Sequence, residues 1–167
     1  MLPLIISVVA GIHTLGAAAG AFGSLFAEIF YAKATRDGKI DTRERDYLSI
    51  TYKTLSWGMM TVLITSILLT GIGLAYPVST ITALSTALWM QITLIFVILL
   101  FAWLLSRSQV SWWVGSSVVF SGWWMFLLLD VFPTNLPYTV LAFAYLIFVF
   151  ICAAVWGYVR VIAMGVK

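Results

Sequence analysis

The sequence predicts an all-α integral membrane protein whose 167 residues form a single bundle of five transmembrane helices. The first reason is composition, because 63% of the residues are hydrophobic and 9% are charged, whereas soluble domains carry about a quarter charged residues. The second reason is that five apolar runs reach roughly the 20 residues that a helix needs to cross a bilayer. The third reason is that all nine Lys and Arg residues fall on one side if five helices alternate in direction.

The five predicted spans are too long and too apolar to be buried helices of a soluble protein. They cover Pro3–Gly23, Trp57–Tyr76, Ala83–Leu105, Trp112–Leu129 and Tyr138–Gly157. The basic residues lie in the first connection, in the third and after the fifth span, while the connections "PVSTITALS" and "DVFPTNLP" contain none. The positive-inside rule therefore predicts an N-terminus outside and a cytoplasmic C-terminus. We expect the plasma (inner) membrane of a prokaryote.

The sequence between the first and second spans predicts a helical hairpin that extends both spans into the cytoplasm. Asp37-Gly38 is a turn signal, and Asp41 followed by Glu44 resembles a capping box at a helix start. We therefore expect the first helix to continue to about Arg36 and the second to begin near Asp41.

The first helix also carries rows of small residues. Gly16, Gly20 and Ser24 recur every four residues, and such rows let helix backbones approach closely in lipid. We therefore expect this helix at the centre of the bundle or of an oligomer. The expected partners are the lipid bilayer and either further copies of the chain or other membrane subunits. The basic residues sit in a few short places, so we expect no nucleic acid as a partner.

Glu28 follows the apolar part of the first helix and lies at the predicted inner membrane edge. Lys53 lies at the same level of the antiparallel second helix. We interpret the two as a structural ion pair at the interface, where water is available to a carboxylate. A proton-relay role for Glu28 is the alternative.

His13 is the chain's single histidine and lies near the middle of the first predicted span. An ionisable residue at that depth is a functional-site hypothesis by default. A haem b iron takes a histidine with a methionine or an open position, and a quinone needs a hydrogen-bond donor at depth. The candidate cofactor-binding residues are therefore His13, Gln91 and Met125, with His13 as the candidate metal ligand.

The structural interpretation of His13 remains open beside the functional one. A neutral imidazole can hydrogen-bond to a polar side chain of another helix and so hold the bundle together. Other spans offer such side chains at a similar depth, namely Thr65, Ser66, Gln91, Thr93 and Ser121.

Several motifs of the first half of the chain occur together. His13 is followed by "LGAAAGAFG", a polar connection, the aromatic-rich "YKTLSWGMM" and a helix that ends in "LLTGIG". Over about residues 10–75 this pattern resembles the CopD-like superfamily of small helical membrane proteins. The resemblance implies a haem- or copper-linked role for His13.

Three function classes follow from the sequence. The first is a redox-linked role, with haem or a quinone, centred on His13. The second is a non-catalytic subunit of a larger membrane complex. The third is a small oligomeric transporter lined by Thr65, Gln91 and Ser121. Whether the protein is an enzyme stays open at this point.

Overall fold

The computed structural model describes residues 1–34, 41–76, 85–132 and 134–164. These residues form five α-helices and no strand. The helices are α1 (Leu2–Ala34), α2 (Thr42–Ala75), α3 (Thr86–Ser106), α4 (Trp112–Val131) and α5 (Tyr138–Met164). All five are long and apolar enough to cross a membrane, which confirms the predicted helix number and class and indicates an integral membrane protein.

The start of α2 and the lengths of α1 and α2 agree with the predicted helical hairpin. α2 begins as predicted, because the Asp41 carboxylate accepts a hydrogen bond from the Thr42 amide while the Glu44 carboxylate accepts one from the Asp41 amide. The predicted turn at Asp37-Gly38 lies outside the described residues. α1 and α2 have 33 and 34 residues. At 1.5 Å per residue each is about 50 Å long, which exceeds the roughly 30 Å hydrocarbon core of a bilayer.

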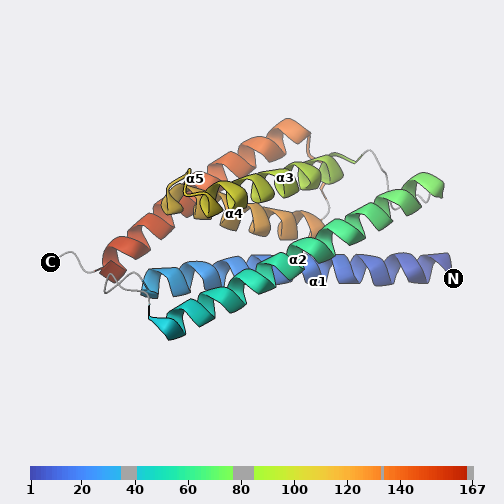
Figure 1. Cartoon of the computed structure of the whole chain (residues 1–167). Helices are drawn as coiled ribbons and strands as arrows, with labels where there is room; N and C mark the ends of the chain where they lie inside the picture. Colours follow the sequence, from blue (N-terminus) through green and yellow to red (C-terminus); the bar gives the residue numbers. More distant parts are fainter. Residues whose placement is uncertain (35–40, 77–84, 133, 165–167) are drawn as a thin grey trace.

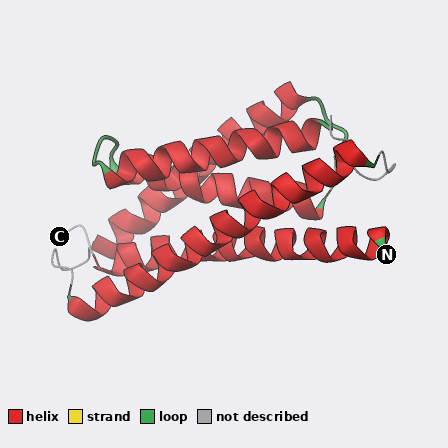
Figure 2. Ribbon diagram, turned by 45° about the vertical axis from the view of Figure 1, so that its right-hand side comes forward, coloured by secondary structure: helices red, strands yellow, loops and turns green. Residues whose placement is uncertain are grey.

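The helices form one elongated bundle in which successive helices run in opposite directions (Figures 1 and 2). α1 packs along α2 and also against α4, while α4 in turn packs against α3 and α5. α2 packs closely on α1 and on no other described helix. α4 is the most buried span, and its Trp123 and Phe126 are among the largest side chains that are fully enclosed. α1 and α4 therefore form the centre of the bundle.

The small residues of α1 lie where other helices come closest. A Cβ atom built on Gly20 would overlap the indole ring of Trp123, and one built on Gly58 of α2 would lie 3.0 Å from the Gly16 carbonyl oxygen. Ser24 is buried, and its hydroxyl donates a hydrogen bond to the Ala21 carbonyl at 2.7 Å. The absence of side chains thus lets α2 and the Trp123 ring approach the backbone of α1.

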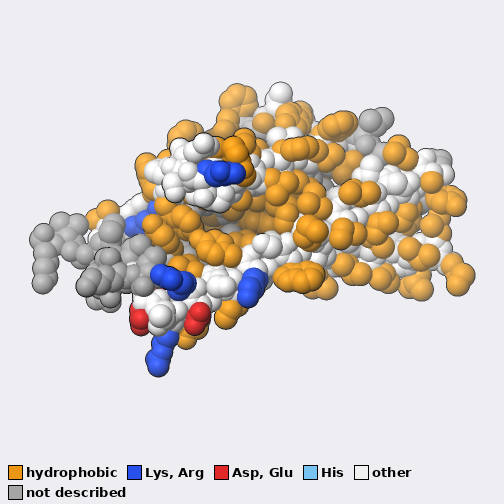
Figure 3. All heavy atoms as spheres, in the orientation of Figure 1, with side chains coloured by type: hydrophobic (Ala, Val, Ile, Leu, Met, Phe, Trp, Pro, Cys, Tyr) orange, Lys and Arg blue, Asp and Glu red, His pale blue; other side chains and the backbone are white. Residues whose placement is uncertain are grey.

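Charged side chains of the described residues gather at one end of the bundle (Figure 3). That end is formed by the close of α1, the start of α2, the α3–α4 turn and the last part of α5. Asp130 near the end of α4 is the one acidic or basic residue of the described part that lies toward the other end, together with His13.

Substituting Gly20 tests this packing directly. Gly20→Ala should destabilise the solubilised protein by about 1–3 kcal/mol, because the added methyl group must displace the Trp123 ring from a packed core. Gly71→Ala is the matched control, since a Cβ there meets nothing within 4 Å and alanine favours the helix. Thermal unfolding in one detergent compares the two variants. Equal melting temperatures would show that the Gly20 contact does not stabilise the fold.

Candidate functional site

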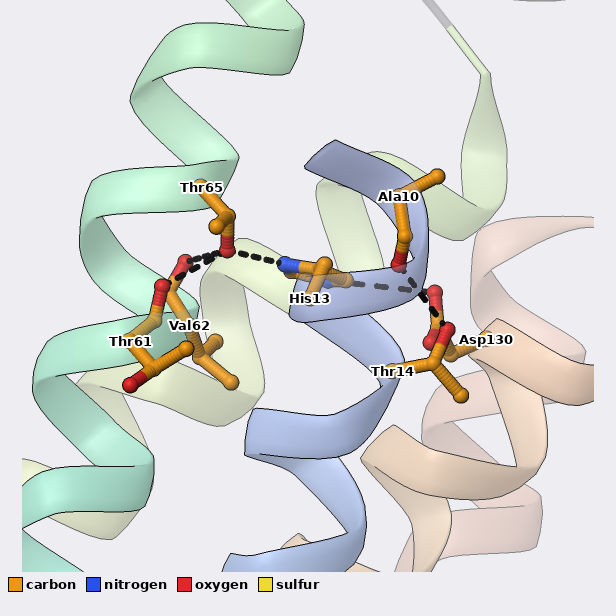
Figure 4. A network of polar contacts seen from close by, with 7 residues as sticks. All are labelled: Ala10, His13, Thr14, Thr61, Val62, Thr65 and Asp130. Carbon is orange, nitrogen blue, oxygen red and sulfur yellow. Dashed lines mark hydrogen bonds and ion pairs between the residues drawn. The ribbon is translucent and has the colours of Figure 1, made fainter. Parts of the chain in front are cut away.

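A buried polar network joins three helices around His13 (Figure 4). The imidazole of His13 is 4% exposed and lies between Thr65 of α2 and Asp130 of α4. Its Nδ1 atom is 2.8 Å from the Thr65 hydroxyl oxygen, and its Nε2 atom is 3.8 Å from Oδ1 of Asp130. The ring of Phe126 packs against it with 5.5 Å between ring centres. The histidine therefore connects α1 to both of its main neighbours.

The hydrogen bonds of Thr65 determine which nitrogen of His13 carries a proton. The hydroxyl of Thr65 has one proton, and its oxygen lies 2.6 Å from the Thr61 carbonyl, to which it donates. The Thr65 oxygen must then accept from His13, so Nδ1 is the protonated nitrogen. Nε2 faces a carboxyl group. In this tautomer Nε2 has a free lone pair and lies 3.8 Å from Oδ1 of Asp130.

Asp130 completes the network but is incompletely satisfied itself. The 3.8 Å between its Oδ1 and Nε2 of His13 is an ion-pair distance and too long for a hydrogen bond. Its other oxygen, Oδ2, is buried and has no hydrogen-bond partner among the described residues. Its side chain is 17% exposed near the end of α4, whereas His13 is enclosed. Asp130 is therefore the member of the pair that lies nearer to the surface.

A second polar cluster lies further along α1 and ties it to α5. Arg160 of α5 donates one hydrogen bond to Oε2 of Glu28 at 2.5 Å and one to the Ser116 hydroxyl of α4 at 2.9 Å. Glu28 is only 2% exposed. The guanidinium group also lies 5.8 Å from the ring centre of Tyr31, which stacks on Trp112. A buried charge pair with this geometry joins α1, α4 and α5.

The structure corrects the predicted ion pair between Glu28 and Lys53. Glu28 binds Arg160, and the side chain of Lys53 is exposed to the surroundings of α2. Glu28 is directed toward α5 and α4, where Arg160 and Ser116 lie. Sequence reasoning missed Arg160 because the fifth span was expected to end at Gly157, whereas α5 continues to Met164.

The two clusters are separated by an apolar layer. Gly20 and Trp123 meet at its centre, and Ala17 and Val62 are fully buried beside them. The third residue that was expected to line a transport path, Ser121, donates to backbone carbonyls of its own helix. The described residues therefore show two polar sites toward opposite ends of the bundle, and no hydrogen bond or ion pair of these residues joins one site to the other.

The contacts of His13 can be compared with those that a cofactor site requires. Gln91 and Met125 are absent from its hydrogen-bond, ion-pair and ring contacts within the described part of the chain. A haem ligand needs a nitrogen that points into a space wide enough for the porphyrin, but both nitrogens of His13 face protein groups. Among the described residues no three His, Cys, Asp or Glu side chains come together as a metal site would require. This arrangement fits neither haem nor copper.

One signal in the sequence could have identified Asp130. It is the only acidic residue in the two connections that lack Lys and Arg, and it directly follows an apolar span. A lone carboxyl group beside a membrane span needs a partner, and His13 is the only His, Asp, Glu, Lys or Arg predicted inside a span.

Comparisons with protein-family models, with curated proteins and with solved structures found no match. The resemblance to the CopD-like superfamily therefore remains a prediction from the quoted motifs.

The partner of Glu28 can be verified by a double-mutant cycle. Arg160→Leu should cost about 3–5 kcal/mol of stability, because it leaves the buried Glu28 carboxylate unpaired. Glu28→Leu combined with Arg160→Leu should cost much less than the sum of the single changes. Lys53→Leu is the control and should change stability by less than about 0.5 kcal/mol. Denaturant unfolding in mixed micelles measures all four; additive effects of the two changes would contradict the pairing.

Proposed function

We propose that this protein is a redox-linked integral membrane protein in which the His13–Asp130 pair exchanges a proton with a membrane-soluble quinone. The observation that carries the proposal is the buried imidazole of His13, whose Nε2 atom lies 3.8 Å from Oδ1 of Asp130. Thr65 fixes the protonated nitrogen on the other side of the ring. A quinone takes up protons when it is reduced, and an imidazole beside a carboxyl group is a suitable proton donor.

Two considerations favour this proposal over the other function classes. A purely structural histidine needs one hydrogen-bond partner, whereas His13 also faces a carboxyl group whose second oxygen has no partner. A transporter for a polar substrate needs a polar path, but an apolar layer around Gly20 and Trp123 separates the two polar clusters. A lipid-soluble partner needs no such path because it approaches from the bilayer.

The proposal includes a second protein as the source of electrons. The residues around His13 do not fit haem or copper. In this proposal the chain therefore supplies the group that exchanges protons and not the group that carries electrons. Electrons then reach the quinone from another membrane subunit that carries a redox cofactor. In this role His13 holds the proton, the more exposed Asp130 passes it between His13 and the quinone, and Thr65 orients the ring.

Electrochemical infrared difference spectroscopy tests the role of the pair. Reconstituted protein with added decylubiquinone should show imidazole and carboxyl bands when the quinone is reduced. Labelling histidine with ¹⁵N assigns the imidazole bands, because the chain has one histidine. His13→Gln should remove the imidazole bands and Asp130→Asn the carboxyl bands.

Asp46→Asn, at an exposed position of α2, is the matched control and should leave both sets of bands in place. Spectra of His13→Gln and Asp130→Asn that match the wild type would refute the proposed proton exchange.

We also propose that the N-terminus lies outside and the C-terminus in the cytoplasm of a prokaryotic cell. The clustering of basic side chains at one end of the bundle supports this orientation through the positive-inside rule. The extended α1–α2 hairpin then projects into the cytoplasm.

Cysteine labelling tests the orientation in a Cys152→Ala background, since Cys152 is the only native cysteine. A membrane-impermeant maleimide should label Asn135→Cys in intact cells and Gln109→Cys only after the membrane is opened. Both positions are exposed and lie in short connections at opposite ends of the bundle. Labelling of both positions in intact cells would contradict the proposed topology.

A further inference from the structure

A cleft of about 640 Å³ lies between α2 on one side and α3 and α4 on the other. Its floor is formed by Ser24, Ala27 and Glu28 of α1. The cleft exists because α2 packs closely on α1 alone and leaves the side toward α3 uncovered. Hydrophobic side chains cover the surface between these helices (Figure 3). In a membrane this side faces lipid, so a ligand would enter laterally from the bilayer.

Two residues that line the cleft, Glu28 and Trp112, each carry a buried polar atom that has no hydrogen-bond partner among the described residues. The Oε1 atom of Glu28 is a buried hydrogen-bond acceptor without a donor. The Nε1–H group of Trp112 is a buried donor without an acceptor. Buried polar groups in proteins are nearly always hydrogen-bonded, so such a pair in one cleft needs an explanation. A group that both donates and accepts hydrogen bonds would satisfy them, and a hydroxyl group has this property.

The charge balance of the site indicates a neutral ligand. The carboxylate of Glu28 is compensated by Arg160, which binds its other oxygen. A cationic ligand would add a positive charge that has no counterion, and an anionic ligand would meet the free oxygen of Glu28. The walls are apolar and aromatic, with Phe120, Trp123 and Met59 among them. They suit the hydrocarbon part of a lipid.

We propose that this cleft binds a neutral lipid whose head group carries a hydroxyl. The hydroxyl donates to Oε1 of Glu28 and accepts from Nε1 of Trp112, and the hydrocarbon tail lies along the apolar walls between α2 and α3. Long-chain alcohols and quinols share this chemistry. The site is independent of the proposed proton exchange at His13, because none of the residues of the His13 network lines the cleft.

Photo-crosslinking in nanodiscs tests the proposal. The probes are a long-chain alcohol with a diazirine in its tail and the corresponding methyl ether, which accepts but cannot donate a hydrogen bond. The alcohol should label cleft residues about tenfold more than the ether, the ratio expected for a hydrogen bond to a charged acceptor. Trp112→Phe keeps the aromatic ring and should lower labelling by both probes, because it removes the donor.

Ala102→Phe should block the cleft, because Ala102 lines it without taking part in the polar contacts. Ala144→Phe is the matched control, since Ala144 is also exposed but lies on α5 away from the cleft. Equal labelling by alcohol and ether, or full labelling of the Ala102→Phe variant, would overturn the proposal.

Competition identifies the source of the hydroxyl. Decylubiquinol and hexadecanol should both suppress labelling of the cleft, and the one that acts at the lower mole fraction is the better ligand. Failure of both to compete would also overturn the proposal. His13→Gln should leave the labelling unchanged, so loss of the infrared signals of His13 and loss of cleft labelling report on separate hypotheses.

Discussion

The contact between the bare backbone of α1 at Gly20 and the indole ring of Trp123 determines the rest of the architecture. It places α4 directly on α1, and the neighbouring approach of Gly58 to Gly16 brings in α2 from another side. Lipid offers no hydrophobic driving force between helices, so their association depends on such close packing and on polar contacts. The contact also forms the apolar layer that keeps the two polar clusters apart.

The spacing along α1 sets where those clusters lie. His13 precedes Gly20 by seven residues and Glu28 follows it by eight, which corresponds to about 10 Å and 12 Å along the helix axis. Each cluster satisfies polar groups that lipid could not. His13 thereby links α1 to α2 and α4, and Glu28 links it to α4 and α5. The polar contacts thus hold α1 to α2 and α4 at one depth and to α4 and α5 at another. They also tie α1 to α5, although these two helices pack less extensively on each other.

The sequence predicts the depth of a residue in the membrane well. It predicts poorly toward which neighbouring helix the side chain of that residue points. The five helices and the cap at Asp41 follow from local patterns, and the structure contains them. Thr65 was one of several hydroxyl or amide partners expected at the depth of His13, and the structure selects it. Choosing among them requires the rotation of each helix, which is set by packing at positions such as Gly20 rather than by hydropathy.

The partner of Glu28 illustrates the same limit. Gly23 faces Leu55 of α2, and Glu28 follows five residues later. At 3.6 residues per turn this moves the side chain about 140° around the helix, toward Arg160 of α5. A prediction that two residues lie at the same depth in the membrane is therefore not enough to predict that their side chains meet. Arg160 became a partner because α5 runs past its predicted end, and Asp130 because α4 packs on α1.

Five buried side-chain atoms of the described residues have no hydrogen-bond partner, and Nε1 of Trp124 and Nε of Arg160 are two of them. Oδ2 of Asp130 belongs to the carboxyl group beside His13, whereas Oε1 of Glu28 and Nε1 of Trp112 belong to residues that line the cleft. A quinol is itself a neutral hydroxylated lipid, so the ligands proposed for the two sites belong to the same chemical class. Residues 13 and 28 of one helix are nevertheless about 22 Å apart along its axis, so one head group cannot touch both. If a quinol serves both sites, it must occupy two positions in succession, and the apolar layer at Gly20 and Trp123 requires it to move between them through the bilayer.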